Sequence, residues 1–166
     1  MPKLEFYFDL ACPFCLKGHD YLKAIIGNYT NIEIEWLPVE AHPRPEKHGR
    51  HSDLCLRGMY IALDAGVDVW DYCERAYEAC LKDRIDIEDA DVLAGYFSGL
   101  MDRDAFAEAI KTGGHADCPD RNNDRAYRDN GVWAVPSFRM DGHKLDSIEG
   151  VGITPEQLKS FLDLAK

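Results

Sequence analysis

The stretch Leu4-Glu5-Phe6-Tyr7-Phe8-Asp9-Leu10-Ala11-Cys12-Pro13-Phe14-Cys15 joins an apolar-rich run to two cysteines that are two residues apart. We expect the run to form a strand and the cysteines to open the helix that follows it. There, unpaired backbone N–H groups and the helix dipole favour a thiolate at Cys12. Pro13 suits the first helical turn, where its missing N–H would have had no partner. Cys15 lies one turn further and can attack a mixed disulfide, so the stretch predicts thiol–disulfide exchange.

A metal site is the first alternative, because zinc ribbons use the same cysteine spacing. Such a site needs a second Cys/His pair at short spacing, and the sequence has none. Three histidines of a later segment, His42, His48 and His51, match no compact zinc pattern. We therefore expect no bound metal. Two buried structural thiols are the remaining alternative for Cys12 and Cys15.

Length and charge narrow the class of protein further. The chain of 166 residues fits one domain, with room for an insertion, and can bury a core of its own. Its formal charge of −11 argues against nucleic acid and anionic membrane surfaces as partners. No stretch approaches the roughly 18 apolar residues of a transmembrane helix.

The start of the chain and the cysteine usage bear on the compartment. Met1-Pro2-Lys3 leads straight into the strand-like run, without the pattern of a signal peptide, so we expect a cytoplasmic protein. A chain that had lost its signal peptide would look the same. In a reducing compartment the other four cysteines are expected to be thiols. They are Cys55, Cys73, Cys80 and Cys118.

The hydrophobic pattern predicts a strand over residues 3–9, a helix over 13–28 and a parallel strand over 31–37. Residues 38–51 hold three prolines and three histidines and are expected to form a loop. Residues 52–131 predict successive helices, over about 54–62, 70–81, 89–100, 102–111 and 119–130. A hairpin of strands 135–140 and 143–148 follows, then a helix with Thr154 as its N-cap and Gln157 completing a capping box.

The order is therefore β-α-β, a block of helices, then β-β-α. With these motifs the chain resembles the DsbA-like branch of the thioredoxin superfamily, closest to the FrnE-type and 2-hydroxychromene-2-carboxylate isomerase group. The resemblance spans nearly the whole chain and is carried by residues 6–15, by the helical segment 86–106 and by Asn130-Gly131-Val132-Trp133-Ala134-Val135-Pro136-Ser137-Phe138. It implies an α/β thioredoxin-like domain of residues 1–38 and 132–166, with an all-helical insertion subdomain at 52–131.

The resemblance also implies roles for individual residues. Cys12 would be the attacking cysteine and Cys15 the resolving one, with Pro13 and Phe14 facing the substrate. Pro136 would be the family's cis-proline, presenting the Val135 backbone to an extended substrate. The family often has Trp or His between the cysteines, and Phe14 supplies no titratable group. We therefore expect a weaker oxidant than a periplasmic-type member.

Several nearby residues have both a functional and a structural interpretation. Asp9 is a candidate proton acceptor for Cys15, or a strand-end residue that bonds the following turn. Lys17 and His19 can stabilise a thiolate, although a solvated helix face is the default expectation.

The cysteines of the helical block have a default interpretation as well. Cys55, Cys73 and Cys80 are expected to be small buried residues. One predicted helix holds Cys73 and Cys80 on the order of 10 Å apart, which is too far for a disulfide between them. Cys118 is expected in a loop at a helix start, where it can be reactive.

We therefore predict a DsbA-like thiol–disulfide oxidoreductase that acts on protein or small-molecule thiols and disulfides. It needs no resident cofactor, a redox partner regenerates it, and glutathione is a candidate co-substrate. One alternative is a glutathione-dependent isomerase or transferase of the kappa type. Those enzymes usually carry serine at the attacking position, so two intact cysteines count against it. The other alternative is a non-enzymatic thioredoxin-fold binding module.

Overall fold

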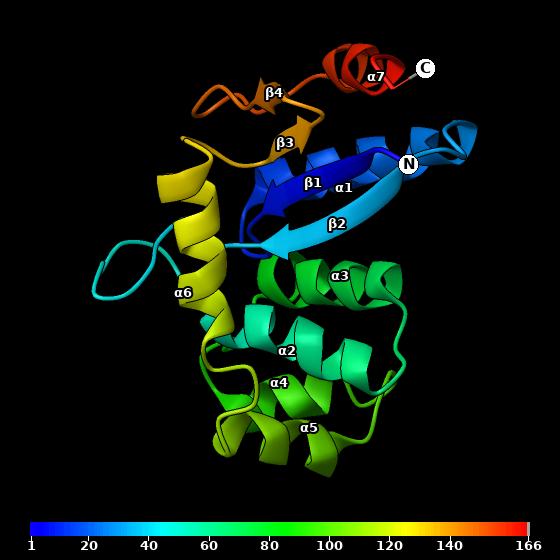
Figure 1. The fold of residues 1–166 in the computed structure, drawn as a ribbon. Helices are drawn as coiled ribbons and strands as arrows, with labels where there is room; N and C mark the ends of the chain where they lie inside the picture. The colour runs from blue at the N-terminus through cyan, green and yellow to red at the C-terminus, as the bar shows by residue number, and fades with distance from the viewer. Residues whose placement is uncertain (166) are drawn as a thin grey trace.

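A computed structural model describes residues 1–165 and is built on a four-stranded sheet with the order β2-β1-β3-β4 (Figure 1). The strands are β1 (Lys3–Phe8), β2 (Glu33–Pro38), β3 (Ser137–Met140) and β4 (His143–Asp146). Strand β1 pairs in parallel with β2 and antiparallel with β3, and β3 and β4 form the hairpin. The predicted parallel β-α-β unit and the hairpin are confirmed.

The apolar run of β1 follows from its place inside the sheet. Leu4, Phe6, Tyr7 and Phe8 are each fully buried, so both faces of the strand are covered. On β3 the Phe138 ring stacks on Phe6, with centroids 4.7 Å apart. The run that decides the fold therefore lies at the centre of the core.

Two helices complete the thioredoxin-like part. Helix α1 (Pro13–Ile25) connects β1 to β2, and α7 (Pro155–Asp163) contacts it at the end of the chain. The predicted helix over 13–28 ends in a tighter 3₁₀ turn, Ile26–Asn28. The Thr154 hydroxyl accepts the Gln157 N–H and the Gln157 side chain accepts the Thr154 N–H, which confirms the capping box.

A helical block between β2 and β3 lies beyond the β2 edge of the sheet, and α6 runs back from it toward β3 (Figure 1). Its elements are α2 (Asp53–Asp64), α3 (Val69–Tyr77), a π-helical turn (Glu78–Lys82), α4 (Ala90–Tyr96), α5 (Arg103–Lys111), α6 (Cys118–Asn123) and a second π-helical turn (Asp124–Asp129). The α/β class with a helical insertion is confirmed. That the insertion and the two flanking segments are separate units stays a prediction.

The main differences from expectation are at helix ends. The helices predicted over 70–81 and 119–130 each change from α to π geometry partway along. The helix predicted over 89–100 ends at Tyr96, shortly before Ser98 and Gly99, which are poor helix formers.

An aromatic cluster joins the insertion to the sheet. The His19 ring of α1 lies 5.0 Å from Trp70 and 5.5 Å from Tyr77, both on α3, and 6.1 Å from Trp36 on β2. His19 is only 1% exposed, so the expectation of a solvated helix face is wrong for this residue. The pattern misled because the insertion covers a side of α1 that would otherwise face water.

Of the helices that residues 1–165 form, none is both long and apolar enough to cross a membrane.

Candidate active site

Cys12 is the N-cap of α1, and its backbone carbonyl accepts the N–H groups of Cys15 at 3.1 Å and Leu16 at 3.2 Å. Cys12 is half-buried, whereas Cys15 is fully buried. The strand-to-helix turn therefore presents one thiol to the surface and keeps the other behind it, with Cys12 at the N-cap and Cys15 three residues further along α1.

The two thiols have opposite electrostatics. The pKa of Cys12 is lowered, mainly because the Cys15 side chain hydrogen-bonds the thiolate, with further N–H donation from Cys15 and Phe14. Burial raises the pKa of Cys15 well above its ordinary value, and the neighbouring Cys12 adds to this. The Asp9 N–H donates to the Cys15 sulfur at 3.3 Å. The surroundings of the pair thus favour the thiolate form at Cys12 and the protonated form at Cys15.

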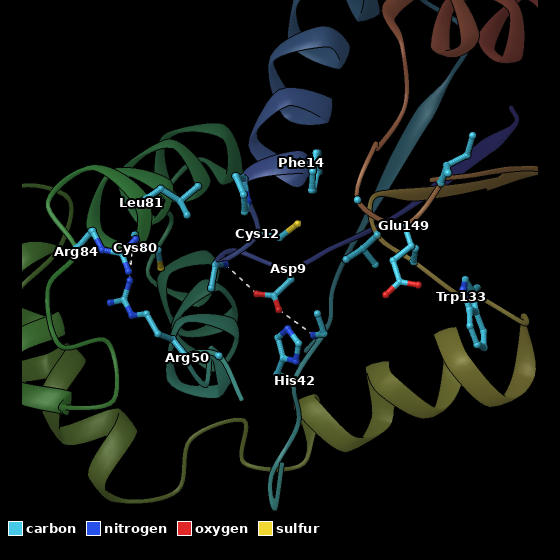
Figure 2. Close-up of a pocket in the computed structure, with 18 residues that line it drawn as sticks. Asp9, Cys12, Phe14, His42, Arg50, Cys80, Leu81, Arg84, Trp133 and Glu149 are labelled. Carbon is cyan, nitrogen blue, oxygen red and sulfur yellow. Dashed lines mark hydrogen bonds between the residues drawn. The ribbon is translucent and has the colours of Figure 1, made fainter. Parts of the chain in front are cut away.

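Asp9 lies at the end of β1 and is 2% exposed. One carboxylate oxygen accepts the Ala11 N–H and the other accepts the Ala41 N–H, each at 2.8 Å (Figure 2). Burial raises its pKa despite these two bonds. The structural alternative, a hydrogen bond to the following turn, is therefore present. The raised pKa also suits a group that exchanges protons near neutrality.

Pro136 lies against the helix that carries the cysteines. The Val135–Pro136 peptide bond is cis. A Cβ added at Gly18 of α1 would come within 3.0 Å of the Pro136 Cγ, so the two backbones approach closely only because residue 18 is glycine. Phe14 is packed in the same way: a Cβ at Gly152 would come within 3.2 Å of its ring.

A cleft of about 680 Å³ opens over Cys12 and is lined by Asp9, Pro13, Phe14 and Val135 among others. Five of the sequence-predicted site residues therefore line one cleft: Asp9, Cys12, Pro13, Phe14 and Val135. Cys15 is buried behind Cys12, and the Pro136 ring lies against Gly18.

Four further residues of the cleft wall were missed. Figure 2 shows Arg50, Cys80 and Arg84 on the insertion side of the cleft and Trp133, which is 81% exposed, on the other. Arg50, Cys80 and Arg84 come from the predicted loop and insertion, and nothing in their spacing points to the CxxC turn. Trp133 lies three residues before Pro136 in the segment 130–138, and this position is the signal that could have identified Trp133 as a cleft residue.

The other candidate residues, Lys17, His42 and His51, have partners of their own. The Lys17 ammonium lies 5.8 Å from the centre of the Phe14 ring. His42 lines the cleft but bonds Glu46 at 2.7 Å, and His51 lies 3.0 Å from the His42 carbonyl. Within the described residues 1–165, no three His, Cys, Asp or Glu side chains are grouped to hold a metal ion.

Cys118 is not a loop residue, contrary to expectation. It is the first residue of α6 and is fully buried. The Arg121 guanidinium donates to its sulfur at 3.1 Å, and His115 Nδ1 lies 3.6 Å away. Burial raises the pKa of Cys118. A buried thiol of raised pKa is a poor nucleophile, so the structure removes the reason for expecting reactivity there.

Solved structures with a similar fold include a disulfide reductase. In Pseudomonas aeruginosa, the cytosolic disulfide reductase DsbM is 16% identical with a TM-score of 0.70, and 98% of each chain is covered. BdbD from Bacillus subtilis is 12% identical with a TM-score of 0.75, over 98% of this chain and 86% of BdbD. The uncharacterized protein YwbO of Bacillus subtilis (strain 168) is 24% identical over 172 residues, covering 81% of this chain and 84% of YwbO.

A family model described as the DSBA-like thioredoxin domain matches residues 3–163, nearly the whole chain. The cysteine pair at the strand-to-helix turn and the helical insertion agree with that match. The chain belongs to the family of DSBA-like thioredoxin domains, and by that membership it is a DsbA-like disulfide oxidoreductase.

Proposed function

We propose that the protein exchanges disulfides through Cys12 as nucleophile and Cys15 as resolving thiol. The observation that carries this is the asymmetry of the pair: Cys12 is half-buried with a lowered pKa, and Cys15 is buried with a raised one. A thiolate is the attacking species in exchange, so only the cysteine that faces the cleft is ready to start the reaction.

In the reducing direction the Cys12 thiolate attacks one sulfur of a substrate disulfide. A Cys12–substrate mixed disulfide forms, and the other substrate sulfur leaves as a thiolate that takes up a proton. The Cys15 thiol then loses its proton and attacks the Cys12 sulfur, which releases the second substrate thiolate. The product is a Cys12–Cys15 disulfide, and the substrate has gained two electrons.

Asp9 is the proposed acceptor of the Cys15 proton. Its backbone N–H already bonds the Cys15 sulfur, and its buried carboxylate has a raised pKa. A carboxylate of raised pKa takes up a proton near neutrality more readily than an ordinary aspartate does. The same N–H stabilises the Cys15 thiolate once the proton has left.

The segment before β3 is the proposed substrate platform, with Pro136 shaping the cleft as the family's cis-proline. Val135 lines the cleft opposite the CxxC turn, so its backbone can pair with an extended substrate. Pro13, Phe14 and the exposed Trp133 add apolar surface beside it. This surface suits a peptide that carries the disulfide.

A cytoplasmic location and the reductase or isomerase direction are the proposed physiological setting. DsbM is a cytosolic disulfide reductase by name, and it has also been solved with GSH. Glutathione is a tripeptide with two carboxylates and one ammonium, and Arg50, Arg84 and Glu149 offer matching charges on the cleft wall. We infer that glutathione, or a thioredoxin-type system, returns the Cys12–Cys15 disulfide to the dithiol. Closeness to the FrnE-type group stays a prediction.

Reduction of insulin tests the proposal against both alternatives. We expect wild type to reduce insulin and Cys12→Ser to lose this activity, while Cys73→Ala, which removes a buried cysteine outside the cleft, keeps it. Cys15→Ala should accumulate a mixed disulfide with the substrate. A kappa-type transferase would instead show glutathione-dependent isomerase or transferase activity without insulin reduction. A binding module would show no trapped mixed disulfide and a Cys12 pKa near that of a free thiol.

A further inference from the structure

Cys55 and Cys80 form a second pair of thiols in van der Waals contact. Cys55 lies in the first turn of α2 and Cys80 in the π-helical turn Glu78–Lys82, and their sulfurs are 3.8 Å apart. A disulfide requires a sulfur separation of about 2.05 Å, so closing the bond needs a movement of about 2 Å at the side-chain ends. Rotation about the Cα–Cβ bonds supplies movements of this size.

Cys80 is the member of the pair that is closer to a substrate. It lines the same cleft as Cys12, and Figure 2 shows it beside Leu81 and Arg84, across the cleft from Cys12. The Arg50 guanidinium donates to the carbonyls of Cys80 and Ile85 and so fixes the backbone of this turn. Cys80 also lies in a π-helical turn, and such turns inside α-helices occur frequently at functional sites.

The two thiol pairs share one buried carboxylate. Burial is the main cause of the raised pKa of Cys15, where the Asp9 carboxylate is a minor cause and the Asp9 N–H acts in the opposite direction. The hydrogen bond with Cys80 and burial are the main causes of the raised pKa of Cys55, and the Asp9 carboxylate is again a minor one. The side chains of Cys55 and Cys80 are both fully buried, out of reach of a dissolved disulfide. Reaction at Cys80 therefore requires a local opening of its turn, which predicts a slow second pair behind a fast one.

We propose that Cys55 and Cys80 are a second redox-active dithiol, which a small disulfide in the cleft, such as glutathione disulfide, oxidises to an intramolecular bond. The Cys80 thiolate attacks one glutathione sulfur, and the other glutathione leaves as a thiol after taking up a proton. The Cys55 thiolate attacks the Cys80 sulfur and releases the second glutathione. Two protein thiols lose two electrons, and one glutathione disulfide becomes two glutathione thiols.

The bond has a structural consequence. It ties α2 to the π-helical turn that forms the insertion-side wall of the cleft, and it closes a loop between positions 55 and 80 of the chain. Constraining that loop in the unfolded chain stabilises the folded state. For a domain of this size we expect the thermal unfolding midpoint to rise by about 5 to 10 °C on oxidation.

The test uses the full chain with Cys12→Ser and Cys15→Ser, so that it does not depend on the proposed activity of the first pair. The folded variant is incubated with glutathione disulfide at pH 8 for minutes to hours and then quenched with acid. Free thiols are counted after denaturation, and linked peptides are identified by mass spectrometry. We expect the count to fall from four to two with a Cys55–Cys80 linkage, and the melting midpoint to rise.

Two further variants in the same background serve as controls. Adding Cys55→Ala should stop the reaction at a glutathione adduct on Cys80, without a rise in the melting midpoint. Adding Cys73→Ala should leave the Cys55–Cys80 linkage intact. The proposal is overturned if the folded protein keeps all four thiols, or if the linkage found joins Cys73 or Cys118. A failure of insulin reduction in wild type would overturn the proposed function and leave this result unaffected.

Discussion

The cysteine pair at the start of α1 and the pair in the helical insertion each consist of two neighbouring thiols, but their surroundings differ. Cys12 occupies the N-terminus of a helix, where backbone N–H groups and the Cys15 side chain stabilise its thiolate. Cys55 and Cys80 lie within helices, are fully buried, and the pKa of Cys55 is raised. Both sites place two thiols close together, so we expect the surroundings, not the pairing, to decide which cysteine is a nucleophile.

The difference shows which features matter for reactivity. We expect partial exposure of one sulfur and hydrogen bonds to its thiolate to make the first pair fast, and burial of both sulfurs to make the second pair slow. The Asp9 carboxylate makes a minor contribution to the raised pKa of both Cys15 and Cys55. Experiments that remove one feature at a time can test this expected difference in reactivity between the two pairs.

The largest expected effect comes from removing the exposed thiolate. Cys12→Ser should lower the rate of insulin reduction by on the order of 1,000-fold or more, because a hydroxyl is not ionised at neutral pH. Cys55→Ala should keep the rate within about twofold, since Cys55 does not supply the attacking group. A large loss of turnover in Cys55→Ala, with its fold intact by circular dichroism, would contradict the separation of the two pairs.

Removal of the shared carboxylate should have the next largest effect. Asp9→Asn should slow resolution of the mixed disulfide by on the order of 100-fold at neutral pH, because the proposed acceptor of the Cys15 proton is replaced by an amide that does not take up protons. Rapid-quench analysis of the mixed disulfide measures this step. The deficit should shrink as pH rises, since hydroxide can then deprotonate Cys15.

Stability offers an independent measurement on the same variant. The folded-state pKa of Asp9 is raised, so wild type loses stability as pH rises from the ordinary aspartate pKa through the raised one. Asn removes that dependence. Denaturant melts should therefore shift in favour of Asp9→Asn as pH increases, and a constant difference across pH would argue against a raised Asp9 pKa.

The contribution of Cys15 to the Cys12 thiolate can be isolated with two substitutions at one position. Cys15→Ala removes the hydrogen bond that is the main cause of the lowered Cys12 pKa, whereas Cys15→Ser retains a donor. Alkylation of Cys12 by iodoacetamide at pH 7 should be about 3- to 10-fold slower in Cys15→Ala than in Cys15→Ser. Thiolate absorbance against pH provides the midpoints, and equal midpoints would assign the shift to the helix terminus instead.

The smallest effect concerns the apolar rim beside the first pair. Trp133→Ala should raise the KM for insulin about threefold and leave Cys12 alkylation unchanged, because Trp133 is 81% exposed and acts only when a substrate covers it. Initial rates at several insulin concentrations separate KM from kcat. A change in kcat alone would mean that Trp133 acts on the chemistry.

The parts of the fold that the sequence predicted are those with local causes. The alternation around β2, the apolar run of β1 and the Thr154 capping box are visible in a few neighbouring residues, and they reappear in the structure. The π-helical turns at Glu78–Lys82 and Asp124–Asp129 were not predicted, because single-residue shifts in hydrogen bonding leave the apolar pattern almost unchanged.

The candidate site divides in the same way. Cys12 and Cys15 follow from the CxxC spacing, and Asp9 from its place just before it. Arg50, Cys80 and Arg84 reach the cleft only because the insertion folds back over the end of α1. The expectation that His19 lies on a solvated helix face was wrong because α3, which belongs to the insertion, supplies the aromatic rings that cover it.

By itself, the sequence determined the reactive turn: a strand, two cysteines at one-turn spacing and a helix that begins between them. Those relations act over a few residues, within the reach of backbone hydrogen bonds and helix dipoles. Only the tertiary structure decided which thiols are buried, that the insertion supplies a wall of the cleft over Cys12, and that Cys55 meets Cys80 across 25 positions of chain. Burial and contact at such separations depend on how helices pack together, and no local pattern encodes that packing.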